Sequence, residues 1–326
     1  MFANNQYEAL DFGENRRIER FGEVILDRPC PAVAHLKKKT PSFWSRADAV
    51  FQIDEKSSKK SNALGQRGIW IGQTELGRSI FQEMTAYQTS GNAVTNSLAW
   101  QIRHDQAVFN LYGTPFGHIG VFPEQAANWD AITAFCLRYS QREMAFRVLN
   151  LFAYTGGSTL AAIQGGAEVV HVDSASNVVG WARKNAELSQ FSQAATRWIV
   201  EDAQKFVRRE LKRGNKYQGI ILDPPSYGHG VRGEVWRLTE QLPDLLLDCF
   251  SLLNFEVPCF LLLTCHTPAF SFNRLVNLVE DSAKDVFQNG FDRRNMHVNA
   301  NTMTLRAKSG AVLPSGESVM FCYNDY

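Results

Sequence analysis

The sequence lacks several features that mark common protein classes. Its six cysteines show no C-x-x-C spacing and no paired pattern, which predicts reduced thiols in a cytoplasmic protein rather than a disulfide framework. No apolar run approaches membrane-spanning length, and the first residues lack a basic segment followed by an apolar one, so we expect no secretion signal and no membrane partner. The seven histidines show no ligand spacing, so we expect no metal. The net charge of +1 is low for a protein with a broad nucleic-acid-binding face.

Short alternating apolar runs characterise the first third of the chain. Residues 23–26, 69–71 and 107–112 are such runs, separated by Pro, Gly, Ser and Asn, and they predict a small antiparallel β domain over residues 1–120. Residues 14–20 have a helical tendency. Two basic clusters, Lys37 to Lys39 and Lys56 to Lys60, are interpreted as solvated loop charge.

Five apolar runs follow after residue 147, each ending on a polar or special residue and each separated from the next by a helical pattern. This alternation predicts an α/β fold with a doubly wound, mostly parallel sheet over residues 121–326. Two further runs near the C-terminus, residues 302–308 and 317–323, are joined by a turn-rich loop. Strands joined in this way pair antiparallel, so the sheet is expected to close with an antiparallel strand.

The first of these runs, Val148 to Phe152, ends in a turn that contains Gly156 and Gly157. A strand, a tight turn and a helix N-terminus expose backbone N–H groups to a nucleotide-type ligand. Asp173 follows the second run about 20 residues later, where an acid meets ribose hydroxyls. The alternatives are an ordinary strand-to-helix turn, and a helix cap at Asp173. A nicotinamide site would need G-x-G-x-x-G after the first strand, and this sequence lacks it.

The motif Asp223-Pro224-Pro225-Ser226-Tyr227 ends the fourth run. Two prolines cannot continue a strand ladder, so they fix a rigid turn at the edge of the sheet where ligands bind. The Asp223 carboxylate and a proline carbonyl could accept hydrogen bonds from a planar amide or amine, and Tyr227 could stack on a flipped base. A turn without catalytic duty is the alternative.

Together, the segment from Leu149 to Gly156, Asp202 after the third run, and the Asp223 motif resemble the class I S-adenosylmethionine-dependent methyltransferases. The resemblance extends to the bacterial 23S rRNA methyltransferases of the RlmI/RlmK kind, without a recognisable PUA module. It implies S-adenosyl-L-methionine as cofactor and places Asp202 and Ala203 at the adenine. The other cofactor-binding residues that it implies are Phe122, Gln125, Phe152, Ala153, Tyr154, Thr155, Gly156, Asp173, Ser174 and Asp223. For the segment around Phe122, a hinge without a ligand is the alternative.

Some relatives of this kind carry a cysteine just after the fifth strand, and Cys265 occupies the matching place. A thiolate that adds to C6 of a pyrimidine activates C5 for methylation. Cys265 is therefore either a catalytic nucleophile or a structural cysteine. Asp223, Pro224, Pro225 and Tyr227 are the other catalytic candidates.

These observations predict a methyltransferase (EC 2.1.1.-) that acts on a base of structured RNA, with rRNA as the expected partner and the N-terminal domain helping to bind it. Two alternatives stay open. One is an enzyme of the same fold that acts on a small molecule or a protein, and the other is a cofactor-binding module without catalysis.

Overall fold

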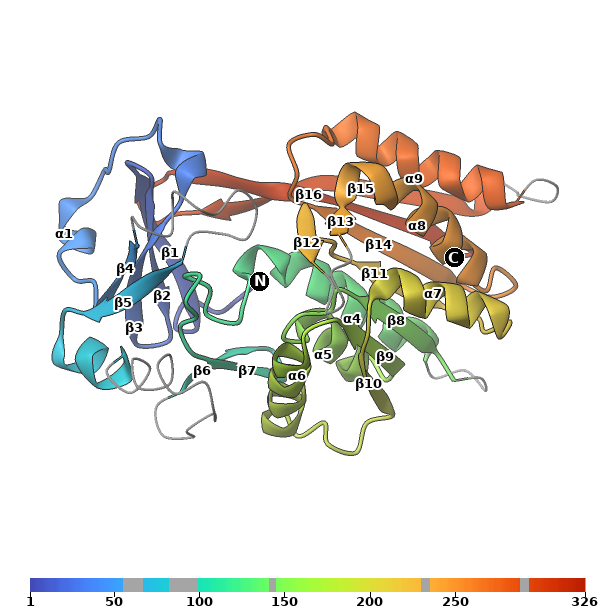
Figure 1. Cartoon of the computed structure of the whole chain (residues 1–326), viewed down its shortest axis with the longest axis horizontal. Coiled ribbons are helices and arrows are strands. Elements are labelled where there is room, and N and C mark those ends of the chain that lie inside the picture. The colour runs from blue at the N-terminus through green and yellow to red at the C-terminus, as the bar shows by residue number, and fades with distance from the viewer. Residues whose placement is uncertain (55–66, 82–98, 141–144, 230–234, 288–292, 326) are drawn as a thin grey trace. The chain divides into compact units, whose positions relative to one another are not determined.

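The computed structural model describes residues 1–54, 67–81, 99–140, 145–229, 235–287 and 293–325 (Figure 1). The cluster Lys56 to Lys60 lies outside these residues. The chain divides into two units, one of residues 1–126 with 304–314 and one of residues 127–303 with 315–326. The first unit therefore includes part of the C-terminal hairpin. The substrate-binding role predicted for residues 1–120 stays a prediction.

The first unit contains a five-stranded sheet in the order β1-β2-β3-β4-β5 and a separate β6-β7 hairpin. Its β3–β4 pair is parallel, so the predicted all-antiparallel arrangement holds only for the other pairs. The elements are β1 (Tyr7–Gly13), β2 (Arg16–Phe21), β3 (Val24–Pro29), η1 (Pro31–Val33), α1 (Pro41–Trp44), β4 (Ala49–Ile53), β5 (Gly68–Gly72), β6 (Trp100–His104), β7 (Ala107–Leu111) and η2 (Pro123–Gln125).

The helical tendency predicted for residues 14–20 is wrong. Glu14 and Asn15 both have positive φ values, 54° and 63°, which is the backbone of a tight hairpin turn, and β2 pairs antiparallel with β1. The charge pattern was misleading because Glu19 is fully buried, where it forms ion pairs with Arg17 and Arg28. A buried carboxylate needs such partners.

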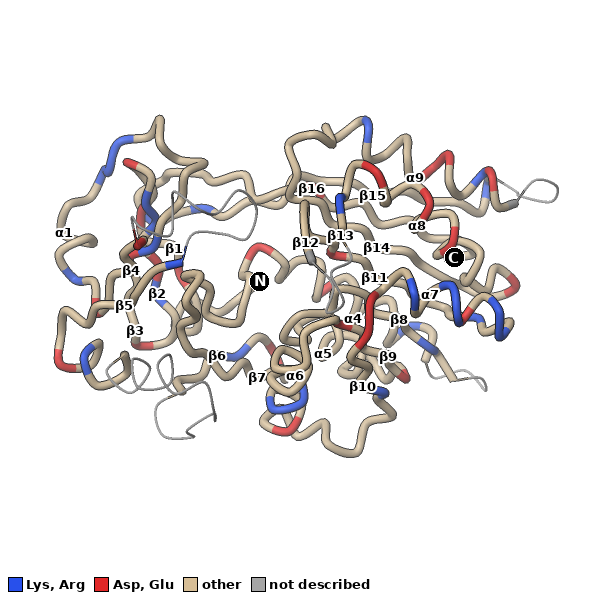
Figure 2. The backbone as a smooth tube through the Cα atoms, viewed as in Figure 1, with Lys and Arg blue, Asp and Glu red and all other residues tan. Residues whose placement is uncertain are grey.

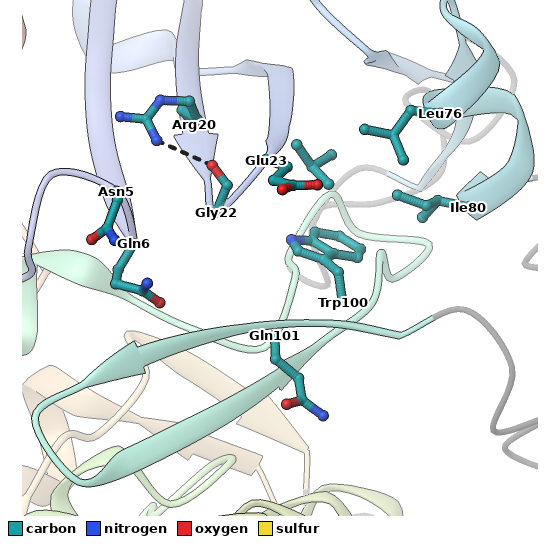
Figure 3. Close-up of a pocket in the computed structure, with 10 residues that line it drawn as sticks. Asn5, Gln6, Arg20, Gly22, Glu23, Leu76, Ile80, Trp100 and Gln101 are labelled. Atoms are coloured by element: carbon teal, nitrogen blue, oxygen red, sulfur yellow. Dashed lines mark hydrogen bonds between the residues drawn. The ribbon is translucent and has the colours of Figure 1, made fainter.

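A pocket of about 590 Å³ opens in the first unit. Figure 3 shows the Trp100 indole from β6 between Glu23 on one side and Leu76 and Ile80 on another. Trp70, in contrast, is buried and stacked on Phe81 with ring centroids 4.8 Å apart, so it is a packing aromatic.

The second unit is built on a seven-stranded sheet in the order β10-β9-β8-β11-β14-β16-β15. The first five strands of this order are parallel, and β16 pairs antiparallel with β14, which confirms the predicted fold class. The elements are α4 (Ala126–Tyr139), β8 (Arg147–Leu151), α5 (Gly157–Gln164), β9 (Glu168–Asp173), α6 (Ser176–Leu188), β10 (Thr196–Val200), α7 (Ala203–Lys212), β11 (Gly219–Leu222), β12 (Tyr227–His229), β13 (Val235–Arg237), α8 (Leu238–Leu252), β14 (Cys259–Cys265), α9 (Phe272–Phe287), η3 (Arg293–Asn295), β15 (Met296–Arg306) and β16 (Val312–Tyr323).

Apolar residues on both faces bury this sheet, as expected for a parallel sheet. Leu149 and Leu151 of β8 point into a core that residues of α7, α8 and α9 share. The intervening Asn150 points to the other face and donates to Thr159 Oγ1 of α5 at 2.9 Å. Alternation along each strand therefore packs helices on both faces and leaves the strand ends to form a site.

Candidate functional site

The carboxyl ends of the parallel strands meet at one rim. Leu151 at the end of β8 pairs with Val172 of β9 and with Leu222 of β11, and Val200 at the end of β10 pairs with Asp173. The strand order reverses between β8 and β11, and ligands of open α/β sheets bind at such a switch point. The residues at the carboxyl ends of these four strands are therefore at one rim, as the sequence predicts.

The turn from Phe152 to Gly156 follows β8 and is conformationally strained. Phe152 and Tyr154 have φ values of 54° and 47°, and Gly156 has 90°. Left-handed backbone costs roughly 1–2 kcal/mol for a residue with a side chain, and strain of this kind gathers at ligand sites. Two backbone hydrogen bonds hold the turn, from Ala153 N–H to the Val172 carbonyl (3.1 Å) and from Gly156 N–H to the Ala153 carbonyl (3.0 Å).

The two glycines of this turn have different roles. Gly156 supplies the positive φ that ends the turn. A β-carbon on Gly157 would lie only 2.5 Å from Cζ2 of Trp129 on α4. Gly157 therefore allows α5 and α4 to pack closely. Thr155 is buried, and its carbonyl accepts from Asn185 Nδ2 of α6 at 2.9 Å.

Asp173 at the end of β9 connects the turn to the next loop. Its Oδ2 accepts from Tyr154 N–H and its Oδ1 from Ala175 N–H, both at 2.9 Å. Burial raises the pKa of this carboxyl above its ordinary value, although backbone N–H groups, including that of Ser174, act in the opposite direction. A carboxylate can accept about four hydrogen bonds, so what these three backbone N–H groups leave is available to a ligand hydroxyl.

Asp202 caps helix α7. Its Oδ1 accepts from Lys205 N–H at 2.9 Å, and Ala203 is the buried first residue of the helix. This arrangement is a side-chain N-cap. The carboxylate is thereby fixed at the rim, and the cap uses its Oδ1. The predicted contact of Asp202 with adenine stays a prediction.

The Asp223 corner is held from two sides. Thr264 Oγ1 of β14 donates to Asp223 Oδ1 at 2.5 Å, and His266 Nε2 lies 3.3 Å from the same oxygen. Trp236 Nε1 of β13 donates to the Pro225 carbonyl at 2.6 Å. The Trp236 ring also packs on Phe152 with centroids 5.1 Å apart, so one indole joins the double-proline corner to the strained turn.

Next to the corner, Ser226 and Thr267 are joined hydroxyl to hydroxyl at 2.5 Å. Pro224 is buried, whereas Pro225 is exposed and Tyr227 is half-buried. The Asp223 side chain is 34% exposed. A planar ligand can therefore reach the carboxylate, one proline and the Tyr227 ring from solvent.

Cys265 occupies a different environment. It belongs to the apolar core cluster that α8 and α9 cover, and its relative exposure is 2%. Its sulfur lies 4.0 Å from the Thr267 carbonyl, and burial raises the pKa of the thiol. The side chain of the neighbouring His266 faces Asp223.

Phe122 and Gln125 belong to the first unit. Phe122 precedes η2 and packs edge-on against His118 with centroids 5.4 Å apart, and Gln125 is buried. Their predicted place at the cofactor stays a prediction.

Sequence reasoning missed Trp236, Thr264 and His266. No motif in the sequence marks Trp236 as a site residue. It reaches Pro225 only because β12 and β13 pair. Thr264 and His266 stand at the end of the fifth apolar run, as Asp173 stands at the end of the second. That position is the signal that could have identified them as site residues.

Charges near this rim are mostly negative among the described residues. Asp173, Asp202 and Asp223 follow three of the strands, and Glu201 is paired with Arg209. Figure 2 shows Lys and Arg gathered along α7, where Arg213 pairs with Glu210 at 3.0 Å. Within the described residues, no helix is long and apolar enough to span a membrane, and no three candidate ligands gather for a metal ion.

Comparison with known proteins agrees with this geometry. Residues 131–285 match the model of a family described as S-adenosylmethionine-dependent methyltransferase. The chain is 33% identical over 197 residues to ribosomal RNA large subunit methyltransferase I of Aeromonas salmonicida, a match that covers 55% of this chain and 48% of that protein. It is 35% identical over 141 residues to the protein of the same name from Tolumonas auensis, covering 43% of this chain and 34% of that protein. The chain thus spans about half or less of the curated relatives it matches.

A solved structure extends the likeness to nearly the whole chain. The S-adenosylmethionine-dependent methyltransferase from Agrobacterium tumefaciens superposes with a TM-score of 0.77 at 28% identity, covering 98% of this chain and 90% of that one. These matches confirm the family resemblance predicted from the sequence.

Proposed function

We propose that this chain, whose residues 131–285 match the model of the S-adenosylmethionine-dependent methyltransferase family, transfers a methyl group to a base of structured RNA. The observation that carries the proposal is the shared rim, where the strained turn, Asp173 and the double-proline corner follow neighbouring parallel strands. Ribosomal RNA is the proposed source of the base, because the curated relatives are named as rRNA methyltransferases.

The residues present suit S-adenosylmethionine. The acceptor capacity that Asp173 retains would serve a ribose hydroxyl, and Asp202 would accept from the adenine amino group beside Ala203. The backbone from Phe152 to Gly156 would face the methionine part, and an acidic rim favours a positively charged sulfonium. When bound, this cofactor supplies an activated methyl group.

The chain's own task is then to align the acceptor atom with that methyl group and to exclude water. Asp223 and the exposed edge of Pro225 would hold a base by its hydrogen-bonding edge, while Tyr227 stacks on its face. Trp236 keeps this corner in register with the cofactor turn, because it contacts both Pro225 and Phe152.

A methyltransferase that acts on a small molecule or a protein is the second candidate. Two observations favour it: the net charge of +1, and the pairing of α7 arginines with Glu201 and Glu210. Both reduce the positive potential available for phosphates.

Transfer of labelled methyl groups tests the proposal. The purified chain is incubated with labelled S-adenosylmethionine and rRNA from a strain that lacks the gene, or with rRNA from the parent strain. Label should enter only the first rRNA. Asp223→Asn should abolish this transfer, whereas Glu168→Gln, at the opposite end of β9, should leave it unchanged. Label in protein or small molecules but not in rRNA would favour the second candidate.

A further inference from the structure

The pocket of the first unit has an apolar floor and a polar edge. Val24 and Ile80 on its lining are buried, whereas Asn5, Glu23 and Gln101 are exposed. Its volume of about 590 Å³ lies in the range of pockets that hold a small molecule. Its lining contains none of the rim residues described above, so it is a second candidate site.

Hydrogen bonds hold the walls of this pocket together. Gly22, in the turn between β2 and β3, donates its N–H to the Gln6 carbonyl at 2.8 Å. The Gln6 side chain accepts from the Arg103 N–H of β6 at 2.7 Å. Gly22 has a φ of 62°, a conformation that glycine adopts without strain. The N-terminal segment, the turn and β6 are therefore fixed to one another, and the pocket is preformed.

Trp100 supplies a flat aromatic ring to the lining of the pocket (Figure 3). The side chain is half-buried, and it packs against Phe81 in a T-shaped contact with ring centroids 6.0 Å apart. Its indole Nε1 is buried and has no acceptor among the described residues, and a donor left in this state calls for a partner. An indole on a pocket wall is a stacking surface for a planar ligand.

Glu23 brings an uncompensated carboxylate to the same pocket. Its side chain makes no hydrogen bond or ion pair with any residue of the described ranges. Arg20, the cation of the lining, is already engaged, because it pairs with Glu8 Oε2 at 3.0 Å and donates to the Gly22 carbonyl at 3.1 Å. The pocket therefore favours a ligand with N–H donors over a phosphate or another anion.

Among planar ligands, a guanine base matches these groups best. Its N1–H and its 2-amino group lie side by side, so they can donate to both oxygens of one carboxylate, as an arginine does in a bidentate pair. Its O6 and N7 can accept from the exposed amides of Asn5 and Gln101. Adenine offers one amino donor beside an acceptor nitrogen, which faces a carboxylate unfavourably. A simple cation would pair with Glu23 but leave the amide donors without acceptors.

We propose that this pocket binds an unpaired guanine of the RNA substrate, with Trp100 stacked on the base and Glu23 accepting from its N1–H and amino group. Unpaired bases are the ones whose Watson–Crick edge is open to such contacts. This inference rests on the proposed function, because it assigns the first unit to recognition of the same RNA. A free guanine nucleotide carries the same base, so the experiment compares the two sources.

Fluorescence anisotropy with the whole chain measures this binding. The probes are short labelled oligouridylates that carry one central guanine or one central adenine. We expect the guanine probe to bind about tenfold more tightly, the scale of one bidentate contact with a base. Equal affinity for the two probes would overturn the inference. Binding of guanosine 5′-monophosphate without binding of the guanine probe would overturn the assignment to RNA.

Variants at the two key residues locate the binding. Glu23→Gln replaces one acceptor oxygen by a donor and should abolish the preference for guanine. Glu75→Gln, at an exposed carboxylate of the same unit outside the lining, should keep it. Trp100→Ala should weaken binding of the guanine probe about tenfold, and Trp100→Phe, which keeps a flat ring, should recover most of that loss. An unchanged preference in Glu23→Gln would overturn the inference.

Methyl transfer separates this inference from the proposed function. With rRNA as substrate, Trp100→Phe and Glu23→Gln should raise KM for RNA and leave kcat and the affinity for S-adenosylmethionine unchanged, because neither residue is at the rim. A lower kcat at unchanged KM would contradict a role in RNA binding. Absence of methyl transfer in the wild-type chain would contradict the proposed function instead, and the preference for guanine is measured without the cofactor.

Discussion

The carboxylate of Asp173 holds the backbone N–H of Tyr154 at 2.9 Å, so the acid after the second strand of the sheet fixes the strained turn after the first. The same carboxylate accepts from Ala175 N–H. One side chain therefore shapes two walls of the proposed cofactor site. This relationship explains how Tyr154 keeps a left-handed backbone, and it makes cofactor affinity sensitive to the charge of Asp173.

Acidification is expected to weaken S-adenosylmethionine binding through Asp173. Burial raises the pKa of this carboxyl, so it takes up a proton at a higher pH than an exposed aspartate. The protonated form loses an acceptor for ribose hydroxyls, and affinity should fall as the pH falls through this raised pKa. Calorimetric titration with S-adenosylmethionine at several acidic pH values measures this loss of affinity. Asp173→Asn, which does not titrate, should bind weakly at every pH. An equally steep pH dependence in that variant would contradict the assignment.

Asp202 can be tested by separating its two roles. Asp202→Ala should destabilise the chain by about 0.5–2 kcal/mol, because the N-cap of α7 is lost. Asp202→Ser keeps a capping oxygen, so its free energy of unfolding should stay near that of the wild type, while its affinity for S-adenosylmethionine falls. Denaturant unfolding measures the stability of both variants, and calorimetry measures their affinity for S-adenosylmethionine. Full affinity in the serine variant would leave Asp202 as a cap only.

Gly157→Ala should destabilise the second unit by about 1–3 kcal/mol, the usual cost of overpacking. The added β-carbon would meet Trp129, so Trp129→Leu in the same chain should recover part of the loss in a double-mutant cycle. Gly180→Ala is the matched control, because nothing lies within 4 Å of its β-carbon position in α6. We expect that control to be neutral or slightly stabilising. Equal destabilisation by the two alanines would argue against the packing role.

His171 predicts a dependence of stability on pH. Burial lowers the pKa of His171 to about 3, and its Nδ1 is hydrogen-bonded to Thr159 Oγ1 at 2.9 Å. Stability from the neutral ring is complete above the unfolded pKa of about 6.5. Between that value and about 3, the unfolded chain binds a proton that the folded chain does not. The free energy of unfolding should then fall by up to about 1.4 kcal/mol per pH unit.

Urea unfolding at several pH values measures this slope. His171→Asn should reduce the slope, even if it also lowers stability at neutral pH. An unchanged slope would show that other groups account for the acid sensitivity.

The sequence was sufficient for the sheet and for the order of acids along its rim. Each of the acids Asp173, Asp202 and Asp223 follows or ends an apolar run, which is a local signal. Parallel pairing of the strands places these run ends at one rim, independently of the loop conformations. The strained backbone at Phe152 and Tyr154 could not be predicted, since neither residue favours positive φ. It depends on the Asp173 carboxylate, which is distant in sequence.

The first unit was harder to predict because its charges are paired inside the fold. Arg17 and Glu19 lie in the stretch predicted to be helical, but Glu19 forms buried ion pairs with Arg17 and with Arg28 of the next strand. The contact between His266 and Asp223 was similarly hard to predict, because the two residues follow different strands.

Calorimetric titration of the whole chain with S-adenosylmethionine tests the central claim most directly. The rim should bind one equivalent, and Asp173→Ala should weaken that binding by about 1.5–3 kcal/mol, the scale of charge-assisted hydrogen bonds, with Glu168→Gln as the unchanged control. No heat with S-adenosylmethionine, or tight binding that Asp173→Ala leaves intact, would show that the cofactor does not occupy this rim.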